Sequence, residues 1–363
     1  MRRVLYVSNR ARGSGVGGRE QLSRLNAQLL RQISGHGFES FELDGDPGIR
    51  KLFGYIDGVS DTTIRMVCDR LRDSGTRQVF LDGSNLGKLA RGIKTALRHI
   101  EVLTFFHNCE ARFFLGALRR SKSPKALAVL VSNYLAERSA VRSSDKRICL
   151  SQRDSDLLQR VYGQGATHVS AMAMADRLPM GNLVPRRVPD ERYALFVGGA
   201  FYANQAGIEW YCRSVTPQVP IRTYVVGKGM AAMKERLERH GNVTVVGEVD
   251  DFAPWYLGAH VVVAPIFDGS GMKTKVAEAL MFGKRVIGTP EAFSGYEDVA
   301  AIAGVTCPDA SSFTRALVSE MERASPVIDQ RLRGLYEDHY SCEAAYSRMQ
   351  SVFGVPLAGG KEL

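Results

Sequence analysis

Residues 264–289 read APIFDGSGMKTKVAEALMFGKRVIGT, and this stretch indicates the fold class more clearly than any other. The apolar run 261–266 predicts a strand, which ends in the turn Asp268-Gly269-Ser270-Gly271. A helical pattern follows, with Lys273 and Lys275 in its first turn, and the apolar run 285–288 predicts a second strand. Strand, turn, helix and strand in this order form the repeating unit of a parallel α/β sheet.

The same stretch has the chemistry of an anion site. Glycines let the backbone approach a phosphate closely, and the N–H groups at a helix start point towards it. Lys273 and Lys275 lie at the unfavourable end of their own helix dipole, where an anionic ligand would offset the cost. Glu278, one turn further on, can reach a hydroxyl pair such as a ribose diol. We predict a site for a nucleoside diphosphate; the alternative is an ordinary strand–turn–helix.

The rest of the chain alternates apolar strand-like runs with helical patterns. The predicted strands of the first part are 4–8, 38–43, 78–81, 102–106, 147–150 and 168–170. Those of the second part are 194–197, 222–226, 243–246, 261–266 and 285–288. Three prolines and no periodicity mark 176–192 as a linker, and helices are expected near 311–323, 327–338 and 342–353. The pattern predicts two parallel α/β domains, each large enough for its own core.

Residues 269–289, GSGMKTKVAEALMFGKRVIGT, resemble the donor-binding motif of family 4 glycosyltransferases, which have the two-domain GT-B fold. The resemblance implies two Rossmann-like domains facing each other across a cleft. The first, 1–187, would bind the acceptor and the second, 188–340, the nucleotide-sugar, with 341–363 a C-terminal helix that can pack back on the first. That family has a Glu-x7-Glu pair on the donor. Glu278 matches its second member, and Ser270, shorter and uncharged, stands at the first.

Residues 195–204, LFVGGAFYAN, resemble the opening of the donor domain in the same family. Many members have an Arg and a Lys here that contact the diphosphate, and this chain has neither. The phosphate contacts must therefore come from elsewhere, and Lys228, Lys273 and Lys275 are the candidates. Val249 follows the third strand of this domain, where the family holds the base through backbone contacts. The whole predicted donor set is Gly17, Gly18, Gly199, Asn204, Lys228, Val249, Ser270, Gly271, Met272, Lys273, Lys275 and Glu278.

Residues 13–18, GSGVGG, match Gly-x-Gly-x-x-Gly, with Glu42 or Asp44 at about the spacing of a dinucleotide fingerprint. An NAD-dependent oxidoreductase is therefore an alternative. However, four residues separate the first strand from the first glycine, whereas the fingerprint turn follows its strand at once. We favour a role for Gly17 and Gly18 at the start of a helix over 19–33, lining a phosphate site.

Residues 104–110, TFFHNCE, place His107, Asn108 and Glu110 at the end of an apolar strand. Polar side chains at the carboxyl ends of parallel strands are typical of binding sites. The stretch resembles the HN-x-E segment of bacterial polysaccharide glycosyltransferases. This resemblance implies that His107 hydrogen-bonds a donor-sugar hydroxyl and that Glu110 orients or deprotonates the acceptor hydroxyl. A buried, hydrogen-bonded His beside an exposed Glu is the alternative.

The charge of the chain is unevenly distributed. Of the 363 residues, 1–187 hold 31 Lys+Arg and 17 Asp+Glu, a net +14, while 188–363 hold 17 and 21, a net −4. A basic half predicts an anionic partner, although an arginine-rich proteome would also explain it. Phe113 and Phe114 lie beside basic residues, a composition that suits a membrane interface. We predict that Asn108, Arg119 and Arg120, like these two, contact the acceptor or the membrane. A buried helix with a solvated basic end would explain the same residues equally well.

No apolar run approaches a membrane span, and MRRVLYVSNR reads as a first strand. Six scattered cysteines without a CxxC pair predict buried free thiols, a reducing compartment and no metal site. We therefore predict a cytoplasmic, peripheral membrane glycosyltransferase, retaining by family resemblance. It would transfer a sugar from UDP- or GDP-sugar to a lipid-linked glycan in bacterial polysaccharide synthesis, with no metal, no other cofactor and no nucleic acid. The alternatives are the oxidoreductase, a nucleotide-sugar 2-epimerase and a non-catalytic scaffold of a polysaccharide assembly complex.

Overall fold

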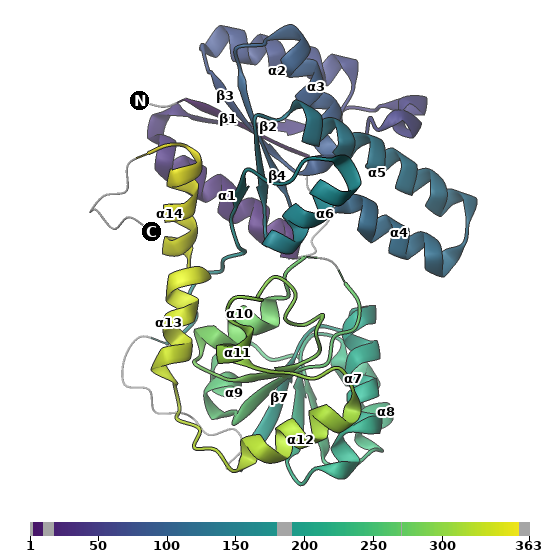
Figure 1. Cartoon of the computed structure of the whole chain (residues 1–363), viewed down its shortest axis with the longest axis vertical. Helices are drawn as coiled ribbons and strands as arrows, with labels where there is room; N and C mark the ends of the chain where they lie inside the picture. The colour runs from purple at the N-terminus through teal and green to yellow at the C-terminus, as the bar shows by residue number, and fades with distance from the viewer. Residues whose placement is uncertain (1–2, 10–17, 180–190, 270, 356–363) are drawn as a thin grey trace. The chain divides into compact units, whose positions relative to one another are not determined.

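The computed structural model describes residues 3–9, 18–179, 191–269 and 271–355. The chain divides into two compact units (Figure 1). Unit 1 comprises residues 1–172 together with 345–363, and unit 2 comprises residues 173–344. The predicted linker, 176–192, therefore lies just inside unit 2, and most of it is outside the described residues.

Unit 1 is built on a parallel sheet with the strand order β2-β1-β3-β4-β5-β6 in the described residues. Its strands are β1 (Val4–Asn9), β2 (Phe38–Leu43), β3 (Gln78–Asp82), β4 (Glu101–Phe106), β5 (Lys146–Cys149) and β6 (His168–Val169). Its α-helices are α1 (Gly18–Ser34), α2 (Asp61–Ser74), α3 (Gly87–Ala96), α4 (Glu110–Ser121), α5 (Pro124–Ser143), α6 (Gln152–Tyr162) and α14 (Cys342–Val352), which joins unit 1 at Ala345. Three short 3-10 helices are η1 (Gly35–Gly37), η2 (Gly48–Phe53) and η3 (Ser84–Leu86).

Alternate residues of these strands point to opposite faces, and both faces are covered. Leu5 and Leu81 pack with α2 and α3, and Phe106 packs with α5 and α6. On the other face Phe80 lies 5.9 Å from Tyr6 and 6.5 Å from Phe353, measured between ring centroids. Phe353 directly follows α14, so the C-terminal helix completes the core of the first unit.

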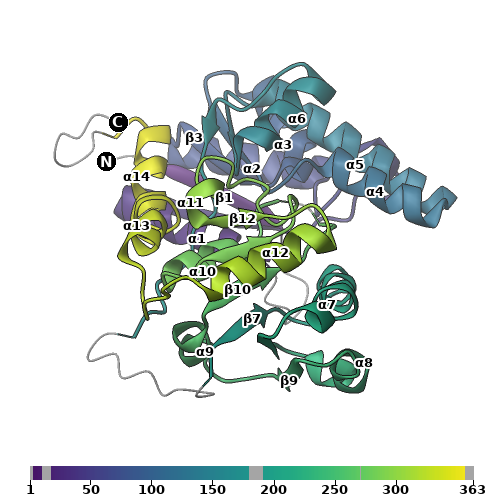
Figure 2. The same cartoon turned by 60° about the horizontal axis from the view of Figure 1, so that its bottom comes forward.

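Unit 2 is a second parallel sheet, with the order β12-β11-β10-β7-β8-β9 in the described residues. Its strands are β7 (Tyr193–Val197), β8 (Arg222–Val226), β9 (Val243–Gly247), β10 (Val261–Ala264), β11 (Val286–Gly288) and β12 (Gly304–Thr306). Its α-helices are α7 (Tyr202–Ser214), α8 (Lys234–Glu238), α9 (Ala253–Gly258), α10 (Thr274–Met281), α11 (Ala300–Ala303), α12 (Ala310–Met321) and α13 (Gln330–His339), with 3-10 helices η4 (Thr216–Gln218) and η5 (Met230–Met233). Buried residues of α7, α8 and α12 form one core with one face of the sheet (Figure 2).

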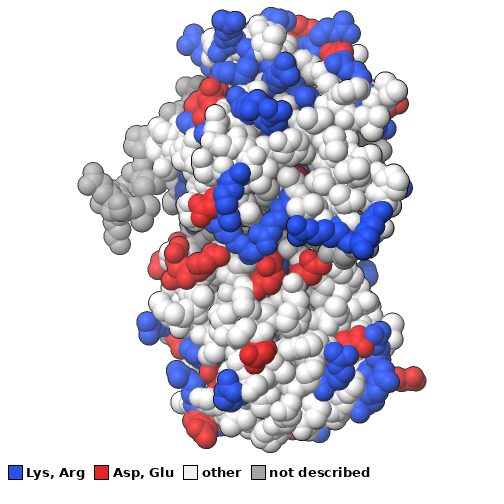
Figure 3. Space-filling view, turned by 45° about the vertical axis from the view of Figure 1, so that its right-hand side comes forward, with Lys and Arg blue, Asp and Glu red and all other residues white. Residues whose placement is uncertain are grey.

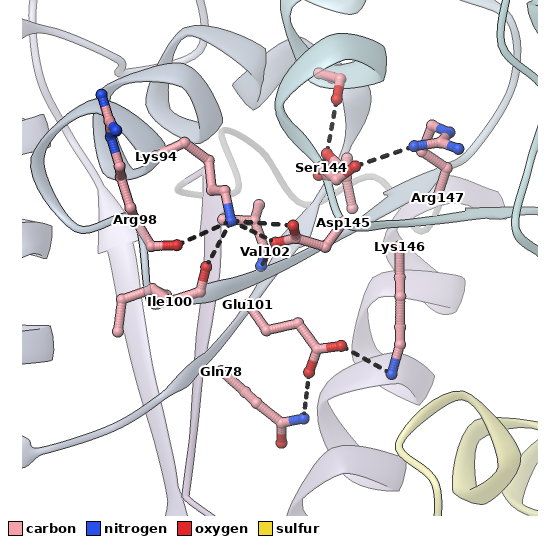
Figure 4. Close-up of polar contacts among 12 residues, drawn as sticks. Gln78, Lys94, Arg98, Ile100, Glu101, Val102, Ser144, Asp145, Lys146 and Arg147 are labelled. Carbon is pink, nitrogen blue, oxygen red and sulfur yellow. Dashed lines mark hydrogen bonds and ion pairs between the residues drawn. The ribbon is translucent and has the colours of Figure 1, made fainter.

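A polar cluster joins the amino ends of β3, β4 and β5, at the edge of the sheet opposite the strand ends that carry polar motifs (Figure 4). Gln78 donates to Glu101 at 2.6 Å, and Glu101 pairs with Lys146 at 2.9 Å. Asp145 accepts from Lys94 at 2.9 Å and from the backbone N–H of Val102 at 2.8 Å. Each charge has an opposite partner or a backbone group, so this cluster stabilises the sheet and leaves no obvious group for a ligand.

The prediction of two parallel α/β sheets is confirmed. The predicted strands match within a residue or two, and the short β12 was not predicted. Of the six cysteines five are buried, Cys342 is half-buried, and all are free thiols. No helix in the described residues is long and apolar enough to cross a bilayer. Nor does any group of three or more His, Cys, Asp or Glu side chains in the described ranges lie close enough to hold a metal ion.

Candidate functional site

The strand orders locate one candidate site in each unit. In a doubly wound sheet, ligands bind at the carboxyl ends of the strands, where the order reverses. In unit 2 the reversal lies between β7 and β10, and in unit 1 it lies between β1 and β3. The loops after β7 and β10 contain the predicted donor motifs, and β3 and its neighbour β4 carry polar residues at the same edge of the first sheet.

Lys275 is buried in the first turn of α10, beside the end of β7. Its Nζ donates to Oδ1 of Asn204 at 3.0 Å and lies 5.4 Å from the centre of the Phe196 ring. Burial lowers the pKa of Lys275 to about 8, with Lys273 acting in the same direction and Glu278 against it. Lys275 makes no ion pair with any carboxylate of the described residues. A buried ammonium with one neutral partner is a strong candidate to bind an anion.

Lys273 has a different environment, although the sequence suggested the same role for both lysines. Its Nζ pairs with Oε1 of Glu291 at 3.0 Å and donates to the carbonyl of Gly271 at 2.8 Å. The hydroxyl of Tyr296 donates to the carbonyl of Lys273 at 2.7 Å. The charge of Lys273 is therefore already balanced, and the side chain closes the turn on which an anion would lie. Glu291 and Tyr296 were not singled out from the sequence.

The turn itself is shaped by glycines. Gly269 has φ +134° and Gly271 has φ +64°, values that side-chain-bearing residues rarely adopt. Oδ1 of Asp268 accepts from the N–H of Gly269 at 2.8 Å. Met272 is buried behind the turn, and Ser270 lies outside the described residues.

Glu278 is half-buried on α10, and its Oε2 accepts from the hydroxyl of Tyr256 at 2.9 Å. Tyr256 is fully buried and stacks on Phe282 at 4.8 Å between ring centroids, which holds the hydroxyl in place. The second carboxylate oxygen has no hydrogen bond from a described residue. Tyr256 belongs to none of the motifs found in the sequence, so nothing in the sequence indicated its hydrogen bond to Glu278.

The remaining donor candidates surround this turn less closely. The carbonyl of Gly199 accepts from Nδ2 of Asn204 at 2.9 Å, so Asn204 connects the loop after β7 to Lys275. Lys228 is exposed, 4.0 Å from Glu248. Val249 is half-buried after β9. Gly18 is the first residue of α1, while Gly17 and the rest of the motif 13–18 lie outside the described residues.

In unit 1, His107 follows β4 and faces Asp82, the last residue of the neighbouring β3. Nε2 of His107 lies 3.3 Å from Oδ1 of Asp82, without the alignment of a good hydrogen bond. Nδ2 of Asn26 on α1 donates to the same oxygen at 3.1 Å. Burial would raise the pKa of Asp82, but His107, Ser23 and Asn26 outweigh it and lower the pKa to about 2. Asp82 ends an apolar strand, so the strand-end argument applied to His107 would have found it too.

Glu110 is the first residue of α4 and is buried. Burial and the charge of Glu137 raise its pKa to about 7, and Asp57 adds to this while Arg19 opposes it. A carboxyl group that titrates near neutral pH can accept or donate a proton under physiological conditions. Asn108 lies between the two candidates and is half-buried.

The predicted acceptor or membrane residues lie further along α4. Phe113 is exposed and packs edge-on against Phe114 at 5.1 Å between ring centroids. Arg119 is exposed near the end of the helix, and the side chain of Arg120 is outside the described part of the structure. These residues belong to α4, which packs against α5 in a hairpin (Figure 1).

Residues 191–323 match the model of the family described as glycosyl transferases group 1. They form a glycosyl transferases group 1 domain. That domain contains β7 to β12 and both lysines discussed above. By this domain the chain is a glycosyltransferase, as predicted. No curated protein matches the sequence.

Solved glycosyltransferase structures share the fold over the whole chain. Sucrose-phosphate synthase from Thermosynechococcus elongatus superposes with a TM-score of 0.71 at 16% identity, covering 98% of both chains. HepE from Anabaena, solved in complex with UDP, gives 0.67 at 12% identity, covering 97% of this chain and 99% of that one. WaaG, a glycosyltransferase involved in lipopolysaccharide biosynthesis, gives 0.64 at 14% identity, covering 97% and 100%. The predicted GT-B fold is confirmed, and at these identities the likeness extends to the fold alone.

Proposed function

We propose that this glycosyltransferase takes a sugar from a nucleoside diphosphate sugar and transfers it to a lipid-linked glycan in bacterial polysaccharide synthesis. The observation that carries the donor half is Lys275, a buried cation at a switch point with no carboxylate partner among the described residues. A diphosphate would provide the missing charge, and the N–H groups at the start of α10 would add to its binding.

In the proposed transfer, the sugar leaves the donor and the nucleoside diphosphate is the leaving group. Lys275 and the start of α10 would stabilise the charge that develops on it, so the proposed chemistry does not require a metal. Glu278, held by Tyr256, would accept from the ribose diol. HepE has been solved with UDP and with UDP-glucose, so UDP is the first nucleotide to test. Retention of the anomeric configuration is part of this proposal, on the family resemblance.

The acceptor half rests on the first unit. His107, held beside Asp82, would hydrogen-bond the transferred sugar, and Glu110 would take the proton from the acceptor hydroxyl. Loss of either side chain should reduce turnover more than donor binding. A nucleotide-sugar 2-epimerase would instead convert the donor with no acceptor present.

An anionic membrane surface fits the α4–α5 hairpin. Residues 111–136 hold five basic and no acidic residues, and Phe113, Leu115, Leu127 and Val131 are exposed there.

Leu127, Val131 and Leu135 lie on one stripe of α5, and Leu135 is in contact with Gly54 at the end of η2. η2 itself exposes Ile49, Leu52 and Phe53. On the face in Figure 3, Lys and Arg outnumber Asp and Glu over unit 1. Apolar side chains among basic ones are typical of a peripheral membrane surface.

Calorimetry with UDP tests the donor site. We expect Lys275→Ala to weaken binding by about 1.5–3 kcal/mol, the range for a charge-assisted hydrogen bond. Because burial lowers the pKa of Lys275 to about 8, the wild-type affinity should fall between pH 7 and 9, and the variant should lose this dependence. Lys234→Ala, on exposed α8 in the same unit, is the control.

An unchanged affinity in Lys275→Ala, with a normal thermal melt, would remove the lysine from the site. Wild-type protein that binds UDP but consumes neither UDP-glucose nor other UDP-sugars with membrane extracts would favour the scaffold.

A further inference from the structure

Glu137 is a fully buried glutamate near the middle of α5 that the proposed chemistry does not use. A carboxylate in such a place is strongly destabilising unless it is paired or hydrogen-bonded. The partners of Glu137 come from three parts of unit 1: the turn after β3, the start of α4, and α6. The second of these parts carries Glu110, the candidate base of the acceptor site.

The carboxylate of Glu137 accepts hydrogen bonds at both oxygens. Oε1 accepts from Oγ of Ser84 and from the N–H of Glu110, each at 3.0 Å. Oε2 accepts from the N–H of Ala111 at 3.1 Å and from the hydroxyl of Tyr162 at 2.7 Å, with Sγ of Cys109 at 3.8 Å. An ionised carboxylate has room for about four donors, so this set of partners fits the charged form. Burial raises the pKa of Glu137; these hydrogen bonds counter the effect only in part, so the pKa stays above its ordinary value.

Glu137 thereby caps a helix to which it does not belong. Cys109, at the N-cap position of α4, makes no capping hydrogen bond with its side chain. The first N–H groups of a helix need such partners, and a negative charge beside them is favourable. Glu137 supplies both for Glu110 and Ala111. Since Glu110 is the first residue of α4, the backbone that carries this carboxyl group is held by Glu137.

The position of Glu137 is fixed in turn by close helix packing. A Cβ at Gly87 would lie 1.9 Å from the carbonyl oxygen of Ala136, so the backbones of α3 and α5 touch beside Glu137. Ser84 lies in η3, which leads directly into α3. The close contact between α3 and α5 thus fixes the carboxylate of Glu137 and the hydroxyl of Ser84 relative to each other.

The charge of Glu137 also acts on Glu110. The charged groups facing Glu110 are Glu137 from α5, Arg19 from α1 and Asp57 from the turn after η2. Glu137 and Asp57 favour the protonated form of Glu110, and Arg19 favours the ionised form. Arg19 and Asp57 are partly exposed and lie 3.9 Å apart, so they largely offset each other. Glu137 is the buried, unscreened member of the group.

We propose that Glu137 is a positioning residue for Glu110: its carboxylate, bonded to the N–H groups of Glu110 and Ala111, fixes the start of α4 and holds a like charge close to Glu110. The proposal rests on the acceptor-side role proposed above for Glu110. It predicts a Glu110 that keeps its proton at mildly acidic pH and loses it near neutrality, as a base for an acceptor hydroxyl requires.

The titration of Glu110 can be followed by NMR on protein with ¹³C-labelled glutamate, with the signal assigned by its loss in Glu110→Gln. We expect a wild-type midpoint near pH 7 and, in Glu137→Gln, a midpoint at least about one pH unit lower, because a like charge has been removed. Tyr162→Phe removes one donor to the same carboxylate and keeps the charge, so its midpoint should match the wild type. A midpoint in Glu137→Gln equal to the wild-type one would overturn the electrostatic part of the proposal.

Glu137→Asp provides a second test, also if Glu137→Gln does not fold. It keeps the charge but withdraws the oxygens from α4 by one methylene. Hydrogen exchange at the amides of Glu110 and Ala111 should therefore be faster than in wild type and in Tyr162→Phe. Equal exchange in all three proteins would overturn the positional part. Both measurements use protein without donor or acceptor. Their results therefore do not depend on whether glycosyl transfer is detected, and the two proposals can fail separately.

Discussion

At the scale of single residues, buried ionisable groups gather at the carboxyl ends of the two sheets. Asp82, Glu110 and Glu137 do so in unit 1, and Lys275 does so in unit 2. Lys284 shows the contrast, because this buried lysine donates to the carbonyls of Leu257 and Pro326 at 3.0 and 3.4 Å, away from the strand ends. A buried charge satisfied by backbone is structural, whereas Lys275 has capacity left for a ligand.

The elevated pKa of Glu110 makes stability depend on pH. Below the ordinary glutamate pKa of about 4.3, the folded and unfolded states both hold the proton. As pH rises from there to about 7, the unfolded state releases the proton while the folded state keeps it, so the free energy of unfolding falls. Glu110→Gln avoids this loss. We expect its stability relative to wild type to be about 2–3 kcal/mol greater at pH 8 than at pH 4, measured by urea unfolding.

Glu235→Gln is the control for this measurement, since it removes one exposed carboxylate from α8. It should change stability little at either pH. If the free energies of unfolding of Glu110→Gln and wild type differed by the same amount at pH 4 and at pH 8, a raised pKa at this position would be contradicted.

At the scale of elements, the loops that follow β7, β8 and β10 are packed backbone to backbone. Gly227, after β8, has φ +148°, and a Cβ there would lie 2.1 Å from the carbonyl oxygen of Gly198. On α7, a Cβ at Gly207 would lie 1.7 Å from the carbonyl oxygen of Pro265. These contacts leave the loops little freedom. The position of Lys275 relative to the turn 268–271 is therefore set by packing between elements.

Gly198→Ala should damage the donor site without unfolding unit 2. The new Cβ would lie 2.8 Å from Nζ of Lys275 and 2.9 Å from Nδ2 of Asn204, so the lysine must move from its place over Phe196. We expect UDP affinity to fall at least about tenfold, which corresponds to about 1.4 kcal/mol. Calorimetry measures the affinity, and circular dichroism checks the fold.

Gly334→Ala, in α13 of the same unit, meets no atom within 4 Å and controls for the substitution itself. Its UDP affinity should equal that of wild type. Should Gly198→Ala bind UDP as tightly as this control, the diphosphate does not depend on Lys275 in the position described.

At the scale of the whole molecule, the division into two units is matched by a division of charge. Each unit has its own sheet and its own buried core. The basic residues 1–187 fall almost wholly within unit 1 or outside the described residues. A charge asymmetry of this kind directs one unit of a protein towards an anionic partner.

Vesicle flotation tests whether that partner is a membrane. We expect the protein to float with vesicles of anionic lipid at low salt, and much less with neutral lipid or at high salt. Each basic residue near an anionic surface contributes about 1 kcal/mol, and exposed charges are screened beyond about 8 Å at physiological ionic strength. Lys122→Glu/Lys125→Glu at the tip of the α4–α5 hairpin should abolish flotation.

Lys234→Glu/Arg239→Glu changes the net charge equally but lies in and just after α8 of unit 2. This matched variant should float like wild type. Equal flotation on neutral and anionic vesicles, or equal loss in both double variants, would leave the basic unit without a membrane role.

The sequence by itself determined the two parallel sheets and the places where their sites begin. Continuous apolar runs separated by helical periodicity are local signals, because each strand and helix is recognised from its own residues. The turn 268–271 with its following lysines, and His107 at a strand end, are local in the same sense. The short β12 was missed because three residues carry too little pattern.

Only the tertiary structure decided which side chains meet. Lys275 and Asn204 are 71 residues apart, and Asn26 and Asp82 are 56 apart. The different environments of Lys273 and Lys275, and the capping of α4 by Glu137, depend on which strands are neighbours and on how closely α3 and α5 approach. Periodicity shows that a residue is buried, but the burial of a charge and the choice of its partner depend on contacts between distant segments. Those contacts set the proton affinity of each group and hence its chemistry.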